Sequence, residues 1–158
     1  MNANRLRRGG ALLAAVAVGM TSASASALSS CAIMGVTGMS FGAYDTQNSR
    51  PVDSTGAVSI RCTGVDSMDS VQIHLGRGGA NSSIARSMRY GNDRLAYNLY
   101  VDAQRTLVWG DGTGGTAIYS RRPPDGREVS VPVFGRIPPL QSVVPGPYSD
   151  MVVVTVLF

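Results

Sequence analysis

The stretch YSDMVVVTVLF (Tyr148–Phe158) is the last part of the chain and has the pattern of an apolar β-strand. Side chains alternate between the two faces of a strand, so every second residue shares a face. One face of this strand is fully apolar and consists of Val152, Val154, Val156 and Phe158. Leaving these four side chains uncovered would cost roughly 6–10 kcal/mol, at about 1.5–3 kcal/mol for each, which is comparable to the stability of a whole domain. Either the rest of the chain covers this face or another polypeptide does.

Short segments with the same alternation recur after residue 28, and Gly, Pro, Asn and Asp residues separate them. No segment there shows apolar residues at helical spacing over a useful length. We expect strands over Ile33–Thr37, Met39–Tyr44, Ala57–Thr63, Ser70–Leu75, Arg86–Tyr90, Arg94–Asp102, Leu107–Trp109, Thr116–Arg121, Glu128–Arg136 and Tyr148–Phe158. Many short strands with turn sequences between them predict a single all-β domain, an antiparallel β-sandwich.

The first 27 residues have the pattern of a signal peptide. A basic segment NRLRRGG (Asn4–Gly10) precedes an apolar core ALLAAVAVGM (Ala11–Met20), and ASASA (Ala23–Ala27) offers small-x-small cleavage sites. We expect cleavage after Ala27, with Ala25 as the alternative, and a mature domain over residues 28–158. The apolar core has ten residues, whereas a membrane-spanning helix needs about 20. We therefore expect an exported protein with no integral membrane segment after the signal is removed.

The expected mature chain is close to neutral. The sequence contains 14 arginines and no lysine, and three of these arginines lie in the signal peptide. Eleven arginines then face 10 acidic side chains, a net charge of +1. A net charge this small provides no electrostatic attraction for nucleic acid or anionic lipid, so we expect no nucleic-acid partner.

Cys31 and Cys62 belong to a chain bound for an oxidising compartment, where a single disulfide is the simplest arrangement. A disulfide across a loop of this length would contribute roughly 3–4 kcal/mol. The alternative is a lipid-modified Cys31, because LSSC (Leu28–Cys31) matches the box that precedes such cysteines in bacterial lipoproteins. Against it, the polar TSASASA (Thr21–Ala27) separates this box from the apolar core, and lipidation would leave Cys62 unpaired.

The motifs that could indicate catalysis or a cofactor have simpler interpretations. WGDGTGG (Trp109–Gly115) resembles a phosphate-binding loop, but a strand rather than a helix is expected after it, so we predict a glycine-rich hairpin loop. Asp111 in this loop lacks the further oxygen ligands that Ca²⁺ requires. His74, the only histidine, alternates with inward apolar residues and should point outward, and no serine motif accompanies it. With one glutamate and no clustered carboxylates, we expect no enzyme, no cofactor and no metal site.

Several longer segments together resemble the spore coat protein U domain family, which includes subunits of archaic chaperone–usher pili. The resemblance covers nearly the whole expected mature chain and is carried by FGAYD (Phe41–Asp45), GAVSIRCTG (Gly56–Gly64), LAYNLYVDAQRTLVWGDGTGGT (Leu95–Thr116), VPVFGRIP (Val131–Pro138) and GPYSDMVVVTVLF (Gly146–Phe158). The order of these motifs is a specific combination. The stretch from YNLY through WGDGTGG is followed by FGRIP and then by a Y-x-D strand that ends in Phe.

The resemblance implies an incomplete immunoglobulin-like antiparallel β-sandwich that lacks one strand. A periplasmic chaperone lends a strand to the open groove, and a neighbouring fibre subunit later replaces it in assembly at an outer-membrane usher. The chain is then expected to be a non-enzymatic structural subunit of a secreted surface fibre or coat, periplasmic in transit and afterwards at the cell surface. The residues implied to line the groove are Val152, Val154, Val156 and Phe158, and Cys31 and Cys62 match the family's disulfide positions.

The start of the expected mature chain departs from the family pattern. A polymerising subunit carries an alternating apolar donor segment before its first cysteine, whereas only LSS (Leu28–Ser30) separates the expected cleavage site from Cys31. This favours a tip position, a chain terminator or a coat component over a major rod subunit. The alternative function is a tip adhesin for a glycan or a surface, whose candidate contacts are Tyr97, Tyr100, Trp109 and Tyr119. Core packing is the simpler interpretation of these aromatic residues.

Overall fold

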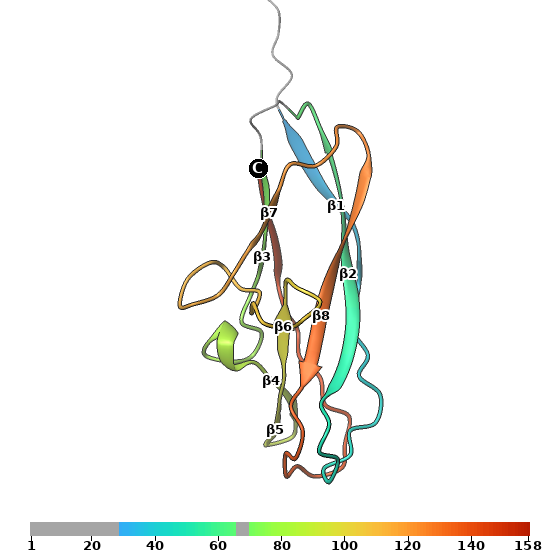
Figure 1. Cartoon of the computed structure of the whole chain (residues 1–158), viewed down its shortest axis with the longest axis vertical. Helices are drawn as coiled ribbons and strands as arrows, with labels where there is room; N and C mark the ends of the chain where they lie inside the picture. Colours follow the sequence, from blue (N-terminus) through green and yellow to red (C-terminus); the bar gives the residue numbers. More distant parts are fainter. Residues whose placement is uncertain (1–28, 66–69) are drawn as a thin grey trace, which may run out of the picture.

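The computed structural model describes residues 29–65 and 70–158, which fold into two antiparallel β-sheets packed face to face (Figure 1). In chain order the strands are β1 (Ser30–Thr37), β2 (Val52–Thr63), β3 (Val71–Leu75), β4 (Ser87–Tyr90), β5 (Asp93–Ala96), β6 (Asn98–Tyr100), β7 (Tyr119–Arg121), β8 (Glu128–Ile137) and β9 (Val154–Leu157). A 3₁₀ turn, η1 (Ser83–Ala85), follows β3. The predicted all-β antiparallel sandwich is confirmed, while the predicted signal peptide (residues 1–27) lies outside the described residues.

The larger sheet is built on a long ladder between β2 and β8. Its strand order is β1-β2-β8-β6, and the ladder extends from the pair Val52 and Ile137 to the pair Arg61 and Glu128. Alternate residues of the two strands point toward the other sheet. These inward side chains are Val58, Ile60, Val131, Val133 and Ile137, and each is at most 5% exposed. Together they form one wall of the core.

The smaller sheet has the order β7-β3-β9, so β9 is one of its edges. A separate hairpin pairs β4 with β5. The inward side chains of β3 are fully buried and form the opposite wall of the core: Val71, Ile73 and Leu75. Trp109 fills the space beside them, where its indole N–H donates to the Ile73 carbonyl at 2.8 Å. In Figure 1 the first described strand begins and the chain ends at the same end of the sandwich.

The segment Met39–Tyr44, predicted as a strand, is not one. Its apolar alternation has another cause, because Met39 and Phe41 turn inward and pack on the core. Both side chains lie against Gly135 of β8, where a Cβ atom would collide with them. Because glycine has no side chain, Gly135 leaves the space that Met39 and Phe41 occupy.

Other predicted strands differ in extent. β2 begins at Val52 rather than at Ala57, β7 covers only the end of the predicted Thr116–Arg121, and the predicted strand Leu107–Trp109 contributes only isolated bridges. The predicted strand Arg94–Asp102 is divided at Tyr97 into β5 and β6, because its two halves pair with β4 and β8 respectively. The terminal strand Tyr148–Phe158 is shorter, since β9 covers only Val154–Leu157 and Ser149 forms an isolated bridge. An interruption of the ladder within one alternating run leaves no trace in the hydrophobic pattern.

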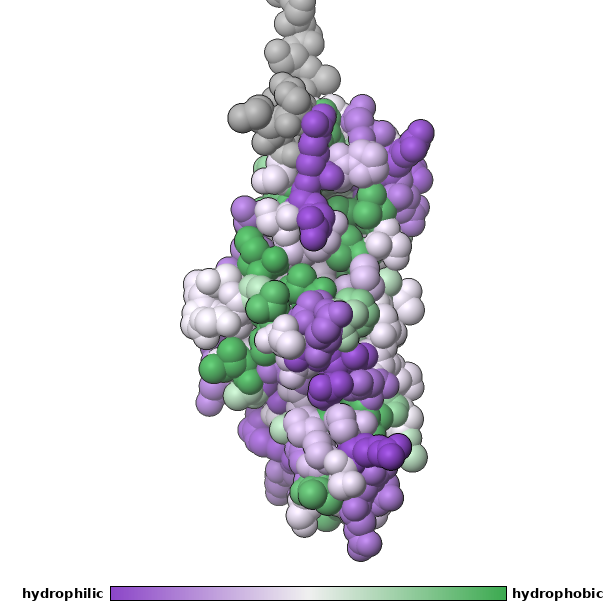
Figure 2. Space-filling model, viewed as in Figure 1, coloured by the Kyte–Doolittle hydropathy of each residue, from purple (hydrophilic) through white to green (hydrophobic). Residues whose placement is uncertain are grey.

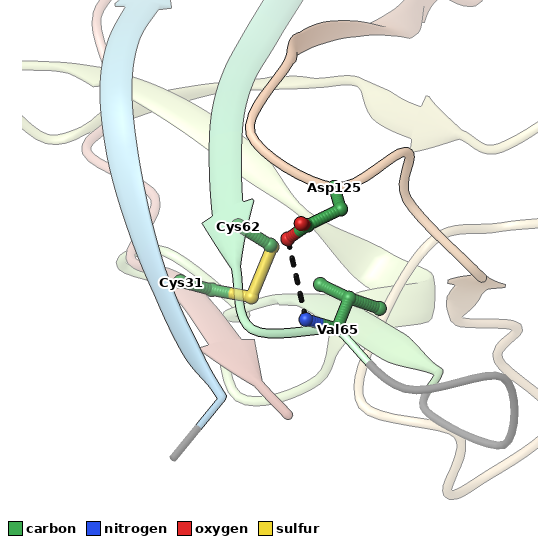
Figure 3. The surroundings of a disulfide bond; sticks show 4 residues. All are labelled: Cys31, Cys62, Val65 and Asp125. Atoms are coloured by element: carbon green, nitrogen blue, oxygen red, sulfur yellow. Dashed lines mark hydrogen bonds between the residues drawn. A yellow bond between two sulfur atoms is a disulfide. The ribbon is translucent and has the colours of Figure 1, made fainter. Parts of the chain in front are cut away.

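Cys31 and Cys62 form a disulfide that ties the edge strand β1 to β2 (Figure 3). The two residues are direct partners in the β1–β2 ladder. Beside the bond, Asp125 accepts a hydrogen bond from the Val65 N–H at 3.3 Å, and the Gly126 N–H donates to the Cys62 carbonyl at 2.8 Å. The predicted disulfide is confirmed, and the Cys31 thiol is therefore not available for a lipid.

Apolar residues reach the surface at several points. In the space-filling view they lie among polar residues near β3, β7 and η1, whereas the two ends of the molecule are mainly polar (Figure 2). Ile84 of η1 and Leu107 are each 54% exposed. Isolated residues of this kind are common on protein surfaces. Within residues 29–65 and 70–158, no helix has the length and apolar character to cross a membrane.

Candidate functional site

The terminal segment is hydrogen-bonded along one edge. β9 pairs with β3, the Gly76 N–H donates to the Val153 carbonyl at 2.8 Å, and Ser149 exchanges two hydrogen bonds with Arg89 of β4. Backbone groups of successive residues in a strand point to opposite edges. The odd-numbered residues therefore direct their N–H and C=O groups toward β3 and β4. The even-numbered residues direct theirs toward the edge without a strand partner, and these are Val152, Val154 and Val156.

The side chains of these even-numbered residues point toward the core. Val154 and Val156 stand opposite Leu75 and Ile73, which are buried. Directly opposed residues of an antiparallel pair share a face. Both valines pack partly on the core and are only half-buried. Val153, on the outer face, is 66% exposed.

Edge strand β1 flanks the same region from the larger sheet, and its inward face is uncovered too. Ile33 and Val36 stand opposite Ile60 and Val58 of β2. The two β2 side chains are 1% exposed, but Ile33 and Val36 are 43% and 57% exposed on the same face. Cα atoms of β1 and β9 come within 8 Å of each other. No ladder joins these two strands in the described part of the chain.

A groove of about 280 Å³ opens between the two sheets on this side, and we call it the inter-sheet groove. Its rims are the end of β1 with the residues after it (residues 36–39) and the terminal segment at Val152 and Val154. Its floor includes Val58, Leu75, Leu99 and Val133. Apolar walls with a few polar groups suit a row of apolar side chains better than a charged ligand.

A carboxylate fixes the start of the terminal segment at the groove. The Tyr97 hydroxyl donates to Asp150 Oδ2 at 2.7 Å, and Asp150 Oδ1 accepts from the N–H groups of Gly79 and Met151 at 2.9 Å. Burial of the phenol and its hydrogen bond to Asp150 raise the pKa of Tyr97 well above its usual value. Gly78 lies so close to this carboxylate that a Cβ atom would collide with it, and its φ of +65° also favours glycine. The terminal segment is thus anchored to the loop after β3.

Two side chains close the groove next to Tyr97. Met39 and Phe41 line both the inter-sheet groove and a second cavity of about 500 Å³ beyond them. Phe41 packs edge-on against Tyr97, with ring centroids 6.2 Å apart. Further along the same segment, the Tyr44 hydroxyl donates to the Pro138 carbonyl at 2.9 Å. The segment after β1 therefore caps this end of the sandwich.

The four residues predicted to line a groove occupy different positions. Val152 and Val154 line the inter-sheet groove, and Val156 packs partly on the core further along β9. Phe158 follows β9 and is 60% exposed, and it is not part of the groove lining. That a partner strand binds these residues stays a prediction.

Sequence reasoning missed the β1 side of the groove. Ile33 and Val36 are three residues apart, a spacing that would place them on opposite faces of a regular strand. A register shift between Ile33 and Gly35 brings both to the inward face. A bulge of this kind re-aims side chains, and Gly35, an isolated glycine within the strand pattern, is the signal that could have indicated it. The inward position of Met39 was likewise hidden by its prediction as part of a strand.

The other candidate residues form no common site. Trp109 is fully buried and Tyr97 is 6% exposed, so neither is available to a surface ligand. Tyr100 and Tyr119 are half-buried. His74 lies on the outer face of β3, with Nε2 3.3 Å from Gln72 Oε1. Among residues 29–65 and 70–158, no three His, Cys, Asp or Glu side chains are grouped so that they could hold a metal ion.

Two sequence comparisons identify similar proteins. The family model of the Spore Coat Protein U domain matches residues 17–155. Protein U of Myxococcus xanthus is 36% identical over 133 residues, and the alignment covers 76% of this chain and 71% of that protein.

The fold is similar to that of a chain from a solved pilus assembly complex. That structure is the CsuC–CsuE chaperone–tip adhesion subunit pre-assembly complex from archaic chaperone–usher Csu pili of Acinetobacter baumannii. The TM-score is 0.56 at 21% identity, and the match covers 83% of this chain and 40% of that chain. The chain thus spans less than half the length of this neighbour. The predicted immunoglobulin-like sandwich is confirmed, and the absence of one strand stays a prediction.

Proposed function

Because the chain belongs to the spore coat protein U domain family, we propose that it is a non-enzymatic structural subunit of an exported surface fibre or coat. Its partners are a periplasmic chaperone, an outer-membrane usher and neighbouring fibre subunits. The structural neighbour comes from a chaperone–subunit complex of a pilus, which supports partners of this kind. The chain passes through the periplasm and ends at the cell surface.

The single observation that carries this proposal is the open side of the sandwich between β1 and β9. The proposed occupant is a strand from another polypeptide, which completes the sandwich by pairing with the free edge of β9. Backbone hydrogen bonds supply affinity in such strand addition, and alternate side chains in the groove supply specificity. The apolar groove lined by Val152 and Val154 supports this mode. Val156 and Phe158 extend the same face toward the end of the chain.

The energy for binding comes from the apolar surface that the occupant covers. Ile33, Val36 and Phe158 are 43%, 57% and 60% exposed. Since full burial of such a side chain is worth about 1.5–3 kcal/mol, covering the exposed part of each contributes roughly 1 kcal/mol. Burial of the half-covered valines adds to this. Single exposed apolar residues need no partner, but a contiguous row of them beside an unpaired strand edge favours the addition of a strand.

If the inserted strand pairs with β1 as well as with β9, β1 must move. A strand hydrogen-bonded on both edges needs neighbours about 4.7–4.9 Å away on each side, so the flanking strands must stand nearly 10 Å apart. Cα atoms of β1 and β9 come within 8 Å. β1 is hydrogen-bonded on one edge only, and it is therefore the strand that moves. The disulfide to Cys62 keeps its first residues attached while the rest moves outward.

The experiment is co-expression with a candidate periplasmic chaperone, followed by isolation of the periplasmic complex. Val154→Asp places a charge in the groove, and we expect at least a tenfold loss of complex, because the carboxylate would be desolvated by the inserted strand. Val153→Asp is the matched control, since Val153 lies on the outer face and is 66% exposed. It should leave the amount of complex unchanged.

A second variant separates loss of binding from loss of folding. Val36→Asp changes a side chain that is 57% exposed, so the isolated domain should tolerate it. We expect this variant to keep its disulfide and its β-sheet circular dichroism but to lose the complex. Equal amounts of complex from the wild type, Val154→Asp and Val36→Asp would refute the proposed mechanism.

A further inference from the structure

A second concave site lies on the outer face of the smaller sheet, opposite to the inter-sheet groove. It is a cavity of about 530 Å³, within the range of about 300–1,000 Å³ that small-molecule sites occupy. His74 of β3 and Thr155 of β9, which are direct ladder partners, belong to its floor. Its walls are the loop after β3 (residues 76–83) and the glycine-rich loop (residues 111–116). We call this site the polar depression.

The two walls lie on the same side of the sandwich. Figure 1 shows η1 and the loop that precedes β7 projecting together from one flank. Arg77, Asn81, Ser82 and Ser83 come from the first wall, and Asp111, Thr113, Gly114 and Thr116 from the second. The lining thus combines a guanidinium, a carboxylate, an imidazole, an amide and several hydroxyl groups with the apolar Leu75.

Arg86 fixes both walls from below. It is 1% exposed, and its guanidinium donates to the carbonyls of Gly76 at 2.7 Å, Ser83 at 3.1 Å and Trp109 at 2.8 Å. A further bond joins it to Asn98 Oδ1 at 2.8 Å. The planar guanidinium places its donors in a fixed fork, so the bases of the two loops are held in one arrangement. A ligand in the polar depression would meet a largely preorganised site, which lowers the entropic cost of binding.

The two charged groups of the polar depression lie on opposite walls. Asp111 Oδ1 accepts hydrogen bonds from the Thr113 hydroxyl at 2.7 Å and the Thr113 N–H at 3.0 Å. These bonds hold the pKa of Asp111 below its usual value, so its carboxylate is ionised at neutral pH. Arg77 makes one long hydrogen bond, from Nη1 to the Asn81 carbonyl at 3.4 Å. Most of its donors are therefore available to a ligand.

This mixture of groups selects a class of ligand. Asp111 would repel and Arg77 would attract a phosphate or sulfate, and a cation would meet the reverse, so the two opposite charges give an ion of either sign little net attraction. An apolar ligand would cover hydroxyl groups without pairing them, at about 1–3 kcal/mol for each buried group. A neutral molecule with several hydroxyl groups can donate to the carboxylate and accept from the guanidinium and the threonine hydroxyls.

We propose that the polar depression binds a neutral saccharide. Hydrogen bonds rather than aromatic stacking hold the sugar, because no Trp, Tyr or Phe lines the site. The site is separate from the inter-sheet groove, since the side chain of Thr155 lies on the outer face of β9 and those of Val154 and Val156 face inward. The subunit can therefore bind a sugar while a partner strand occupies the groove.

The test applies the purified, exported full chain to an array of neutral, sialylated and sulfated glycans. We expect binding to neutral glycans. Thr155→Val preserves the shape and strand preference of the residue but removes its hydroxyl from the floor, and it should weaken binding to the positive glycans at least tenfold. Asp111→Asn should weaken it by a similar factor, whereas Asp45→Asn, which changes an exposed aspartate outside the depression, should leave it unchanged.

Melting temperatures of the variants accompany the array, because the loop around Asp111 depends on its hydrogen bonds to Thr113. If Asp111→Asn unfolds the loop, Thr155→Val alone decides the result, since it changes no loop residue. Absence of binding to every neutral glycan would overturn the proposal. So would binding restricted to sialylated or sulfated glycans, or binding that Thr155→Val leaves unaltered.

Discussion

The centre of the larger sheet and the open side of the sandwich have similar sequence patterns but differ in burial. In the centre, which we call the closed side, β2 and β8 pair with each other, and the inward residues Ile60 and Val131 are 1% and 2% exposed. On the open side, the inward residues Ile33 and Val36 of β1 are 43% and 57% exposed. Each closed-side strand has a neighbour on both edges, whereas β1 and β9 have one neighbour each.

This comparison separates two kinds of information in the sequence. Alternation of apolar residues specifies which face of a strand is to be buried, but it does not specify what buries it. The outer faces of the closed and open sides also differ in which residues they expose. Asp53 and Arg136 form a bidentate pair on the closed side, whereas Met151 and Val153 are exposed on the open side. The open side therefore exposes apolar side chains on both of its faces.

The largest expected difference is between two isoleucines that face each other in the β1–β2 ladder. Ile60→Ala leaves a cavity in the closed core and should lower the free energy of unfolding by about 2–5 kcal/mol. Ile33→Ala should lower it by less than about 1 kcal/mol, because nearly half of this side chain already contacts water. Urea denaturation of both variants measures the two values. Similar losses would mean that β1 is covered in the isolated chain and would remove the distinction between the two sides.

Loss of the disulfide should have the next largest effect. Replacement of Cys31 and Cys62 by serine should lower the free energy of unfolding by roughly 3–4 kcal/mol. The effect on dynamics should be uneven, because β1 keeps one neighbour and β2 keeps two. Amide hydrogen exchange should accelerate in β1 and change little in the β2–β8 ladder. Equal acceleration in both would show that β1 is as firmly held as the closed side.

The smallest expected effect concerns the outer face of the closed side. The hydrogen bond from Arg136 lowers the pKa of Asp53, and Arg105 at 3.4 Å acts in the same direction. The carboxylate therefore adds stability above its unfolded-state pKa of about 3.9, and this contribution is lost as the pH falls through the lower folded-state pKa. Since the pair is partly exposed, Asp53→Asn should cost only about 0.2–1 kcal/mol at pH 7. Urea denaturation at pH 7 and below pH 3 measures the loss of unfolding free energy that Asp53→Asn causes. This loss should disappear below pH 3. A loss that persists there would show that the substitution acts through packing.

The sequence predicted the elements whose burial depends on local alternation. β2, β3 and β8 lie in segments predicted as strands, although β2 begins earlier than predicted, and the disulfide partners were predicted from the expected export of the chain. The pairing of the terminal strand was not predictable in the same way. Its backbone bonds to β3 and β4 depend on loops such as the one anchored by Asp150, and contacts of this kind join residues far apart in the chain.

The β1 side of the groove was missed for a different reason. A bulge after Ile33 changes which residues face inward, and Gly35 permits it but does not require it. The polar depression was also hidden, because its two walls come from separate loops whose bases are joined by the buried guanidinium of Arg86 and by the bond from the Leu75 N–H to the Gly110 carbonyl. The glycine-rich segment was correctly predicted as a loop, but it does not close a hairpin, because the bridge between Trp109 and Ala117 is parallel. Its neighbour across the depression came from the structure alone.

The most direct measurement of the central claim supplies the proposed strand within the same molecule. An Asn-Gly turn and a short strand of alternating Val and Thr are added after Phe158, so that a hairpin can place the new strand along the free edge of β9. The control carries Asp in place of the added valines. Thermal melting and amide hydrogen exchange are then compared with those of the wild-type chain.

If the open side accepts a strand, the Val/Thr extension should raise the melting temperature by about 10 °C or more. It should also slow exchange of the Val154 and Val156 amides, which face the free edge, and the Asp control should do neither. An unchanged melting temperature, with Val154 and Val156 amides that exchange as in the wild type, would show that the isolated domain is already complete and would contradict the proposed function.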